Sequence, residues 1–143
     1  MKNIVVGVDA SATAETAARK AAELAVATGA TLHVVSAYEK FKTEVVEEGP
    51  EKFDRSTEDL AAEHAVHVIY NLKRDLPALV AEPSAVEGKP GEALVQRAHE
   101  VDAELIVIGN KRVQGPSRVF GSIATDVMHK APCDVYVAHT VER

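Results

Sequence analysis

A glycine-rich, basic stretch runs from Gly109 to Ala124 and reads GNKRVQGPSRVFGSIA. Glycine lets the backbone turn and approach an anion closely, and the amides and dipole at a helix start attract negative charge. Three cations raise the local potential, and Ser122 would add a hydroxyl donor. The stretch therefore predicts a site for a phosphate-bearing ligand, the alternative being a surface loop whose basic residues are solvated. Its glycines are Gly109, Gly115 and Gly121, and its cations are Lys111, Arg112 and Arg118.

A second polar position, Asp9, follows the apolar run IVVGV near the N-terminus. Its carboxylate could reach a ribose hydroxyl or a metal-bound phosphate beyond the end of that run. Alternatively, Asp9 caps the helix that follows it. The ligand interpretation is favoured only if the fold brings Asp9 and the stretch after Gly109 to the same place.

The order of the expected elements decides whether these two positions meet. Short apolar runs alternate with segments of helical periodicity along the chain. Strands are expected at Asn3–Asp9, Thr31–Glu39, Leu79–Val86, Glu104–Gly109 and Cys133–Thr140, and helices at Thr13–Ala30, Ser56–Leu76, Gly91–Val101 and Ser122–Lys130. Ser11 and Ser56 are expected to cap the first two helices, and the charged stretch Phe41–Asp54 to be a surface loop or a mobile flap. Pro83 weakens the third strand.

This alternation predicts an α/β fold with a doubly wound, mostly parallel sheet and right-handed crossovers. Ligands of such sheets sit outside the carboxyl ends of the strands, where the strand order reverses. The loops after the first and fourth strands, which carry Asp9 and Gly109, are therefore expected to lie at one edge and to form one site.

Composition narrows the class of protein and its partners. The 143 residues, 46% of them apolar, fit one domain over residues 1–143. A net charge of −6 argues against a nucleic-acid partner, which needs a broad basic face. Cys133 is the only cysteine, so no intramolecular disulfide and no zinc thiolate cluster is expected. No apolar run reaches membrane length, and we expect a cytoplasmic protein without a membrane partner.

The chain lacks the residues that several classes of enzyme and signalling protein require. A dinucleotide enzyme needs a glycine fingerprint where this chain has Asp-Ala-Ser, and an aspartate-nucleophile phosphatase needs a second aspartate where Ser11 stands. A response-regulator receiver needs an acidic pair that is missing. His64 and His67 share a helical face, but with no third ligand we interpret them as a solvated pair. No residue is placed as a base for nucleotide hydrolysis, so a binding protein is expected, not an enzyme.

The whole chain resembles the universal stress protein family, through IVVGVDAS, VEGKPGEAL, ELIVIGNK and GSIATDVMHKAPCDVYV. The resemblance implies a five-stranded parallel sheet in the order 3-2-1-4-5, an adenine nucleotide alpha-hydrolase-like fold. It also implies a role in stress response without established catalysis and, in one branch, bound ATP or another adenine nucleotide, with Mg²⁺ accompanying it. An interaction module that binds no nucleotide is the alternative.

The same resemblance assigns candidate site residues. It places Gly7, Val8 and Asp9 beside the adenosine and Ala37 in the adenine pocket. Adenine, ribose and phosphates would be faced by Ile108, Gly109, Asn110, Gly121, Ser122 and Ile123. It further implies a homodimer through the last strand, and the apolar segment Asp134–His139 fits this because an uncovered sheet edge tends to pair with another chain.

The chain departs from the ATP-binding pattern at two positions. The pattern has glycine, two residues, glycine, nine residues, glycine, then serine or threonine. Arg112 occupies the middle glycine position, and eight residues separate it from Gly121. Ala10 stands where the family commonly has glycine. Arg112 would therefore be either a phosphate contact or a plug that closes the site.

Replacing Arg112 with glycine tests these two roles. If Arg112 is a plug, R112G strengthens ATP binding, because the backbone regains its close approach to phosphate. If Arg112 clamps the phosphates, R112G weakens binding, because a charge-assisted hydrogen bond is lost. Calorimetric titration of both proteins with ATP distinguishes the two, and equal affinities would contradict both roles.

Overall fold

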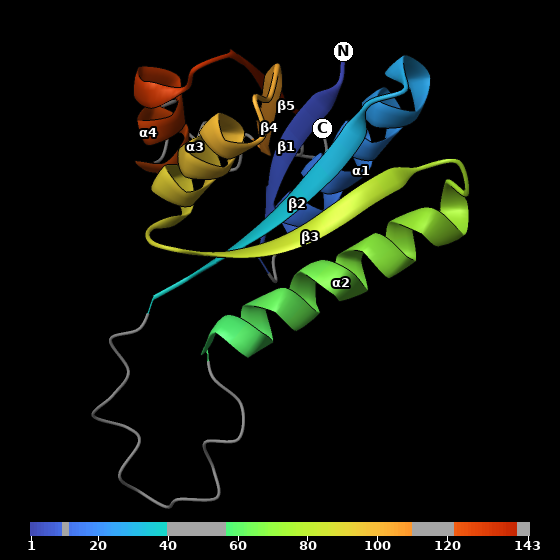
Figure 1. Ribbon diagram of the computed structural model, residues 1–143, viewed down its shortest axis with the longest axis horizontal. Coiled ribbons are helices and arrows are strands. Elements are labelled where there is room, and N and C mark those ends of the chain that lie inside the picture. Colours follow the sequence, from blue (N-terminus) through green and yellow to red (C-terminus); the bar gives the residue numbers. More distant parts are fainter. Residues whose placement is uncertain (10–11, 40–56, 110–121, 140–143) are drawn as a thin grey trace, which may run out of the picture.

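The computed structural model describes residues 1–9, 12–39, 57–109 and 122–139, without the side chains of Ala12, Thr13 and Ser122. Strands and helices alternate, and all strand pairs are parallel, in the order β3-β2-β1-β4-β5 (Figure 1). This confirms the predicted fold and strand order. The elements are β1 (Asn3–Val8), α1 (Ala12–Thr28), β2 (Thr31–Tyr38), α2 (Thr57–Asp75), β3 (Val80–Glu87), α3 (Pro90–Glu100), β4 (Leu105–Gly109), α4 (Ser122–Lys130) and β5 (Asp134–Ala138).

The observed boundaries lie close to the predicted ones, and local chemistry explains the ends. α1 stops at Thr28 because Gly29 takes a φ of +76°, and Ala30 N–H then donates to the carbonyl of Ala25. Pro83 stands inside β3 opposite Val34, which is tolerated because β3 is an edge strand. The expected charged loop and the capping residues Ser11 and Ser56 lie outside the described residues.

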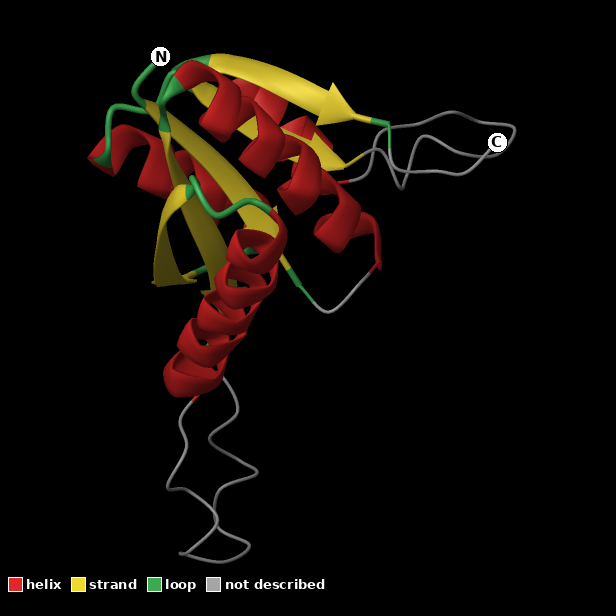
Figure 2. Ribbon diagram, turned by 90° about the vertical axis from the view of Figure 1, so that its right-hand side faces the viewer, coloured by secondary structure: helices red, strands yellow, loops and turns green. Residues whose placement is uncertain are grey.

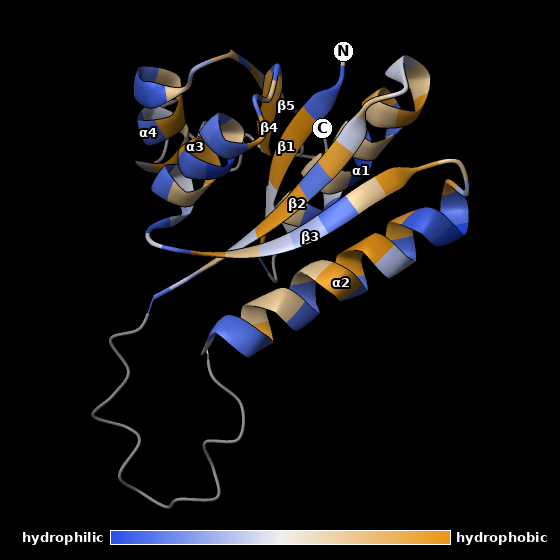
Figure 3. Ribbon diagram, viewed as in Figure 1, coloured by the Kyte–Doolittle hydropathy of each residue, from blue (hydrophilic) through white to orange (hydrophobic). Residues whose placement is uncertain are grey.

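Helices cover both faces of the sheet, as Figure 2 shows from the side. α1 and α2 bury one face together with Ile4, Val6 and Leu32. α3 and α4 bury the other face with Val5 and Ile106. Alternate residues of the central strands thus enter two different cores, which explains why these strands are mainly apolar (Figure 3).

α1 approaches the sheet through a face of small residues. Five alanines at helical spacing are at most 1% exposed: Ala17, Ala18, Ala21, Ala22 and Ala25. Small side chains let the helix backbone lie close to the β-branched residues of β1, so the alanine-rich composition of α1 is a packing feature. In the described part of the chain, no helix is both long enough and apolar enough to cross a membrane.

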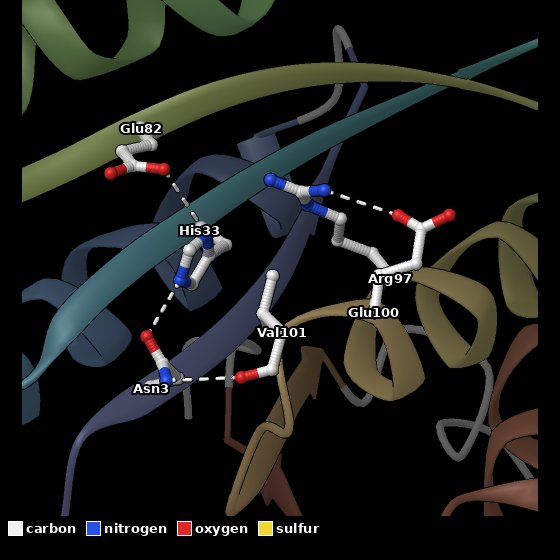
Figure 4. Close-up of polar contacts among 6 residues, drawn as sticks. All are labelled: Asn3, His33, Glu82, Arg97, Glu100 and Val101. Carbon is white, nitrogen blue, oxygen red and sulfur yellow. Dashed lines mark hydrogen bonds and ion pairs between the residues drawn. The ribbon is translucent and has the colours of Figure 1, made fainter.

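A polar cluster lies between α3 and the strands that it covers (Figure 4). His33 of β2 is 4% exposed, and its Nε2 is 2.9 Å from Oδ1 of Asn3. Asn3 in turn donates from Nδ2 to the carbonyl of Val101, at 3.0 Å. Because Asn3 Oδ1 can only accept, His33 carries its proton on Nε2. The other ring nitrogen, Nδ1, is 3.9 Å from a carboxylate oxygen of Glu82 and has no hydrogen-bond partner.

The surroundings of His33 favour its neutral form. Burial is the main cause that lowers its pKa below the ordinary value, and the positive charge of Arg97 lowers it further. The carboxylate of Glu82 raises the pKa and opposes them. Arg97 itself is paired with Glu100, with 3.1 Å between Nη1 and Oε1. Burial and Arg97 prevail over Glu82, which is 60% exposed and screened by water.

His33 is therefore predicted to make the protein acid-sensitive. Its pKa is lower in the folded than in the unfolded chain, so the unfolded chain binds the extra proton as the pH falls below about 6.5. As the pH falls from this value to the pKa of the folded state, the free energy of unfolding decreases by at most about 1.4 kcal/mol per pH unit. His33→Gln keeps a hydrogen-bond donor for Asn3. It should reduce the dependence of the free energy of unfolding on pH, measured by urea denaturation at a series of pH values below about 6.5.

The control is His99→Gln, which changes an exposed histidine in the last turn of α3. This variant should keep the wild-type slope. Equal slopes for wild type and His33→Gln would contradict the assigned role of His33.

Candidate functional site

The strand order reverses between β1 and β4. The two strands are parallel neighbours, with Val6 opposite Val107, so Asp9 and Gly109 reach the same edge of the sheet. From this edge the chain continues into α1 on one face and into α4 on the other. Doubly wound sheets bind ligands beyond the strand ends at such a point of reversal. The sequence-based expectation that Asp9 and Gly109 lie at the same edge of the sheet is confirmed.

The predicted adenosine residues point to both faces. Ala37 and Ile108 belong with the core beneath α3 and α4. Gly7 faces the same side, because its nearest neighbours are side-chain atoms of Leu94 in α3. Val8 instead packs into the core beneath α1 and α2. A ligand on the α3 side would therefore meet Val8 only through its backbone.

Gly7 has a packing role that is independent of any ligand. A Cβ built on Gly7 would lie 2.9 Å from Cδ2 of Leu94, closer than carbon atoms normally approach. A side chain at this position would require the end of the Leu94 side chain to shift. The absence of a side chain at Gly7 therefore leaves room for Leu94 between α3 and β1, whatever else the residue does.

The start of α4 is fixed by a second close contact. A Cβ on Gly91 of α3 would lie 2.8 Å from Cβ of Asp126 and 3.2 Å from the carbonyl oxygen of Ile123. α4 begins at Ser122, and its first turn holds no acidic residue to offset the partial positive charge of its amides. Ile123 in that turn is 37% exposed. The helix start can therefore attract an anion.

Sequence reasoning missed a residue that contacts this edge. Nε2 of His64 in α2 lies 2.8 Å from the carbonyl oxygen of Asp9, to which it donates. The sequence indicates a solvated His64; the structure adds a protein partner to this half-buried side chain, through a bond that is itself exposed. His64 lies between Ala61, Ala65 and Val68 on the helix surface, and two of these are buried. This position turns the ring toward the sheet, and it is the signal that could have identified it.

The adjacent strand end also contacts α2. Glu58 of α2 lies near Tyr38, the last residue of β2, and acts on its hydroxyl. Burial, followed by the negative charges of Glu58 and Glu87, raises the pKa of Tyr38 above its ordinary value, so the phenol stays protonated. Tyr38 directly follows Ala37, the residue expected in the adenine pocket.

Part of the expected site is not described. Asn110, Arg112 and Gly121 lie outside the described residues, and of Ser122 only the backbone is described. In the described residues, no group of three or more histidine, cysteine or carboxylate side chains is arranged to hold a metal ion. The described part of the site thus consists of two strand ends, a helix start and the contacts from α2.

Comparisons with known proteins identify the family of the chain. A model of the universal stress protein family matches residues 1–139. A universal stress protein of Mycobacterium tuberculosis (strain H37Rv) is 30% identical over 152 aligned positions, which cover 97% of each chain.

Solved structures give the same result. The crystal structure of a universal stress protein in complex with cAMP has a TM-score of 0.72 and 26% identity, covering 98% of both chains. The universal stress protein of Archaeoglobus fulgidus in complex with dAMP has a TM-score of 0.64 and 31% identity, covering 96% of this chain and 97% of that one.

Proposed function

The chain belongs to the universal stress protein family, and we propose that it binds an adenine nucleotide beyond the ends of β1 and β4. The observation that carries this proposal is the convergence of Asp9, Gly109 and the start of α4 at the point where the strand order reverses. A carboxylate suits ribose hydroxyls, and the amides of a helix start suit a phosphate. In this proposal, nucleotide binding biases a homodimer or its partners in a stress response, without catalysis.

The nature of the neighbours' ligands supports an adenine nucleotide with a single phosphate group. Both cAMP and dAMP, the ligands of two similar structures, carry one phosphate. A single phosphate at the start of α4 needs no metal ion. ATP binding would bring Mg²⁺, a cation that prefers oxygen ligands such as the carboxylate of Asp9. We place this function in the cytoplasm, where adenine nucleotides are made and used.

Titration calorimetry of nucleotide-free protein tests the proposal. We expect saturable binding of at least one of cAMP, dAMP, AMP and ATP at millimolar ligand or below, with ATP tested both with and without Mg²⁺. Asp9→Asn should weaken binding by roughly 10-fold or more, since a hydrogen bond to a charged group contributes about 1.5–3 kcal/mol.

The matched control is Asp102→Asn, which makes the same change just before β4, at the opposite edge of the sheet. Asp102 has a φ of +53°, a conformation that asparagine tolerates. This variant should bind like wild type. If wild type binds none of the four nucleotides and no adenine nucleotide co-purifies with it by mass spectrometry, the alternative holds: an interaction module that binds no nucleotide.

We further propose that the homodimer forms through β5 and residue His139, the segment Asp134–His139. In the described sheet β5 pairs only with β4 and leaves its outer edge uncovered. Apolar surface accompanies this edge: Tyr136 on β5 is 38% exposed and Met128 on α4 is 42% exposed. Pairing the edge with a second copy would satisfy its backbone groups and cover these side chains.

Tyr136→Glu is expected to shift the protein from dimer to monomer. Tyr136 is the middle residue of β5, so a two-fold axis near the strand centre would bring the two new carboxylates close together. Light scattering after size exclusion measures the mass. Tyr70→Glu, on an exposed face of α2, is the control that should leave the dimer intact. A wild-type monomer, or a dimer that Tyr136→Glu does not weaken, would refute the interface.

A further inference from the structure

α2 contacts the ends of two neighbouring strands through its first two turns. His64 contacts the residue that follows β1, and Glu58 contacts the last residue of β2. Fifty-five positions separate His64 from Asp9 in the chain, so only the tertiary fold brings them together. In Figure 1, the start of α2 lies beside the strand ends at the edge that carries the candidate site.

The carbonyl of Asp9 lies beyond the strand pairing on both sides. The register of β1 with β2 ends at Val8 opposite Ser36, and that with β4 ends at Val6 opposite Val107. A backbone carbonyl at a strand end needs a donor from elsewhere. His64 supplies this donor at 2.8 Å, within the range of a normal hydrogen bond.

Fixing this carbonyl restricts the chain at the candidate site. The carbonyl direction sets the ψ angle of Asp9, and with it the direction in which the chain leaves β1. The two contacts of α2 also flank the expected pocket, since Tyr38 adjoins Ala37 on the neighbouring strand. α2 thus contacts the end of β1, where the ligand is expected to bind, and the end of β2, next to the residue expected in the adenine pocket.

We propose that His64 is a positioning residue of the nucleotide site, which holds the end of β1 in the geometry that the ligand needs. This inference rests on the proposed function. His64 does not touch the ligand: it acts through the Asp9 carbonyl and couples the docking of α2 to nucleotide binding. By linkage, a bound nucleotide strengthens the contact between His64 and Asp9 as much as that contact strengthens nucleotide binding.

The test compares two variants of His64 that are similar in size but differ in their ability to donate a hydrogen bond to the Asp9 carbonyl. The amide nitrogen of His64→Gln can replace Nε2, whereas His64→Leu fills similar space without a donor. We expect His64→Leu to weaken affinity for the best-binding adenine nucleotide by about 3- to 10-fold, the equivalent of one partly exposed hydrogen bond, and His64→Gln to restore most of it.

The matched control is His67→Leu. His67 is exposed one turn further along α2, and its Nε2 lies 3.3 Å from Asn71 on the same helix. It should leave nucleotide affinity unchanged. Recovery by glutamine is the decisive readout, because a general loss of helix packing would affect the leucine and glutamine variants alike. Equal affinities of wild type and His64→Leu would overturn the proposal.

A measurement without ligand separates this inference from the proposed function. The ¹⁵N chemical shifts of the His64 ring in the nucleotide-free protein should show a hydrogen on Nε2. A ring protonated only on Nδ1 would overturn the contact itself. If wild type binds no nucleotide although Nε2 carries this hydrogen, the proposed function fails and the positioning role fails with it, while the contact stands.

Discussion

β1 pairs with β2 on one side and with β4 on the other, while helices cover both of its faces, and this arrangement constrains the rest of the fold. Ile4, Val5 and Val6 are completely buried. A strand in this position must be apolar on both faces and paired on both edges, because no water reaches its backbone. The first places where polar groups can face a ligand are the ends of the strand. The candidate site lies at its carboxyl end because the crossovers diverge there.

Close backbone packing transmits this constraint to the helices. Gly7 leaves room for the Leu94 side chain between α3 and β1, and Gly91 lets α4 lie against α3. The absent side chain at Gly91 therefore sets how closely the start of α4 approaches α3. Ligand-binding glycines and packing glycines look alike in a sequence, and at Gly7 the structure shows a packing contact that would exist with or without a ligand.

Two histidines illustrate how position in the fold decides a side chain's chemistry. His33 is buried beneath α3, and its surroundings favour the neutral ring. His64 lies at the carboxyl edge and donates to a backbone carbonyl of a distant strand. Both occupy regular elements whose sequence periodicity marks them as ordinary surface or core positions. Their different roles arise from partners that are remote in the chain, such as Asn3 and Asp9.

The sequence by itself determined the alternation of elements, the parallel sheet and the edge at which Asp9 and Gly109 meet. These follow from local signals: apolar runs, helical periodicity, and turn residues such as Gly29, each legible within a few positions. The resemblance to a known family added the strand order. Only the tertiary structure decided that Val8 faces away from Ala37 and Ile108, that Gly7 accommodates Leu94, and that His64 holds the end of β1. These features depend on contacts between residues tens of positions apart, and such contacts leave no periodic trace in a single sequence.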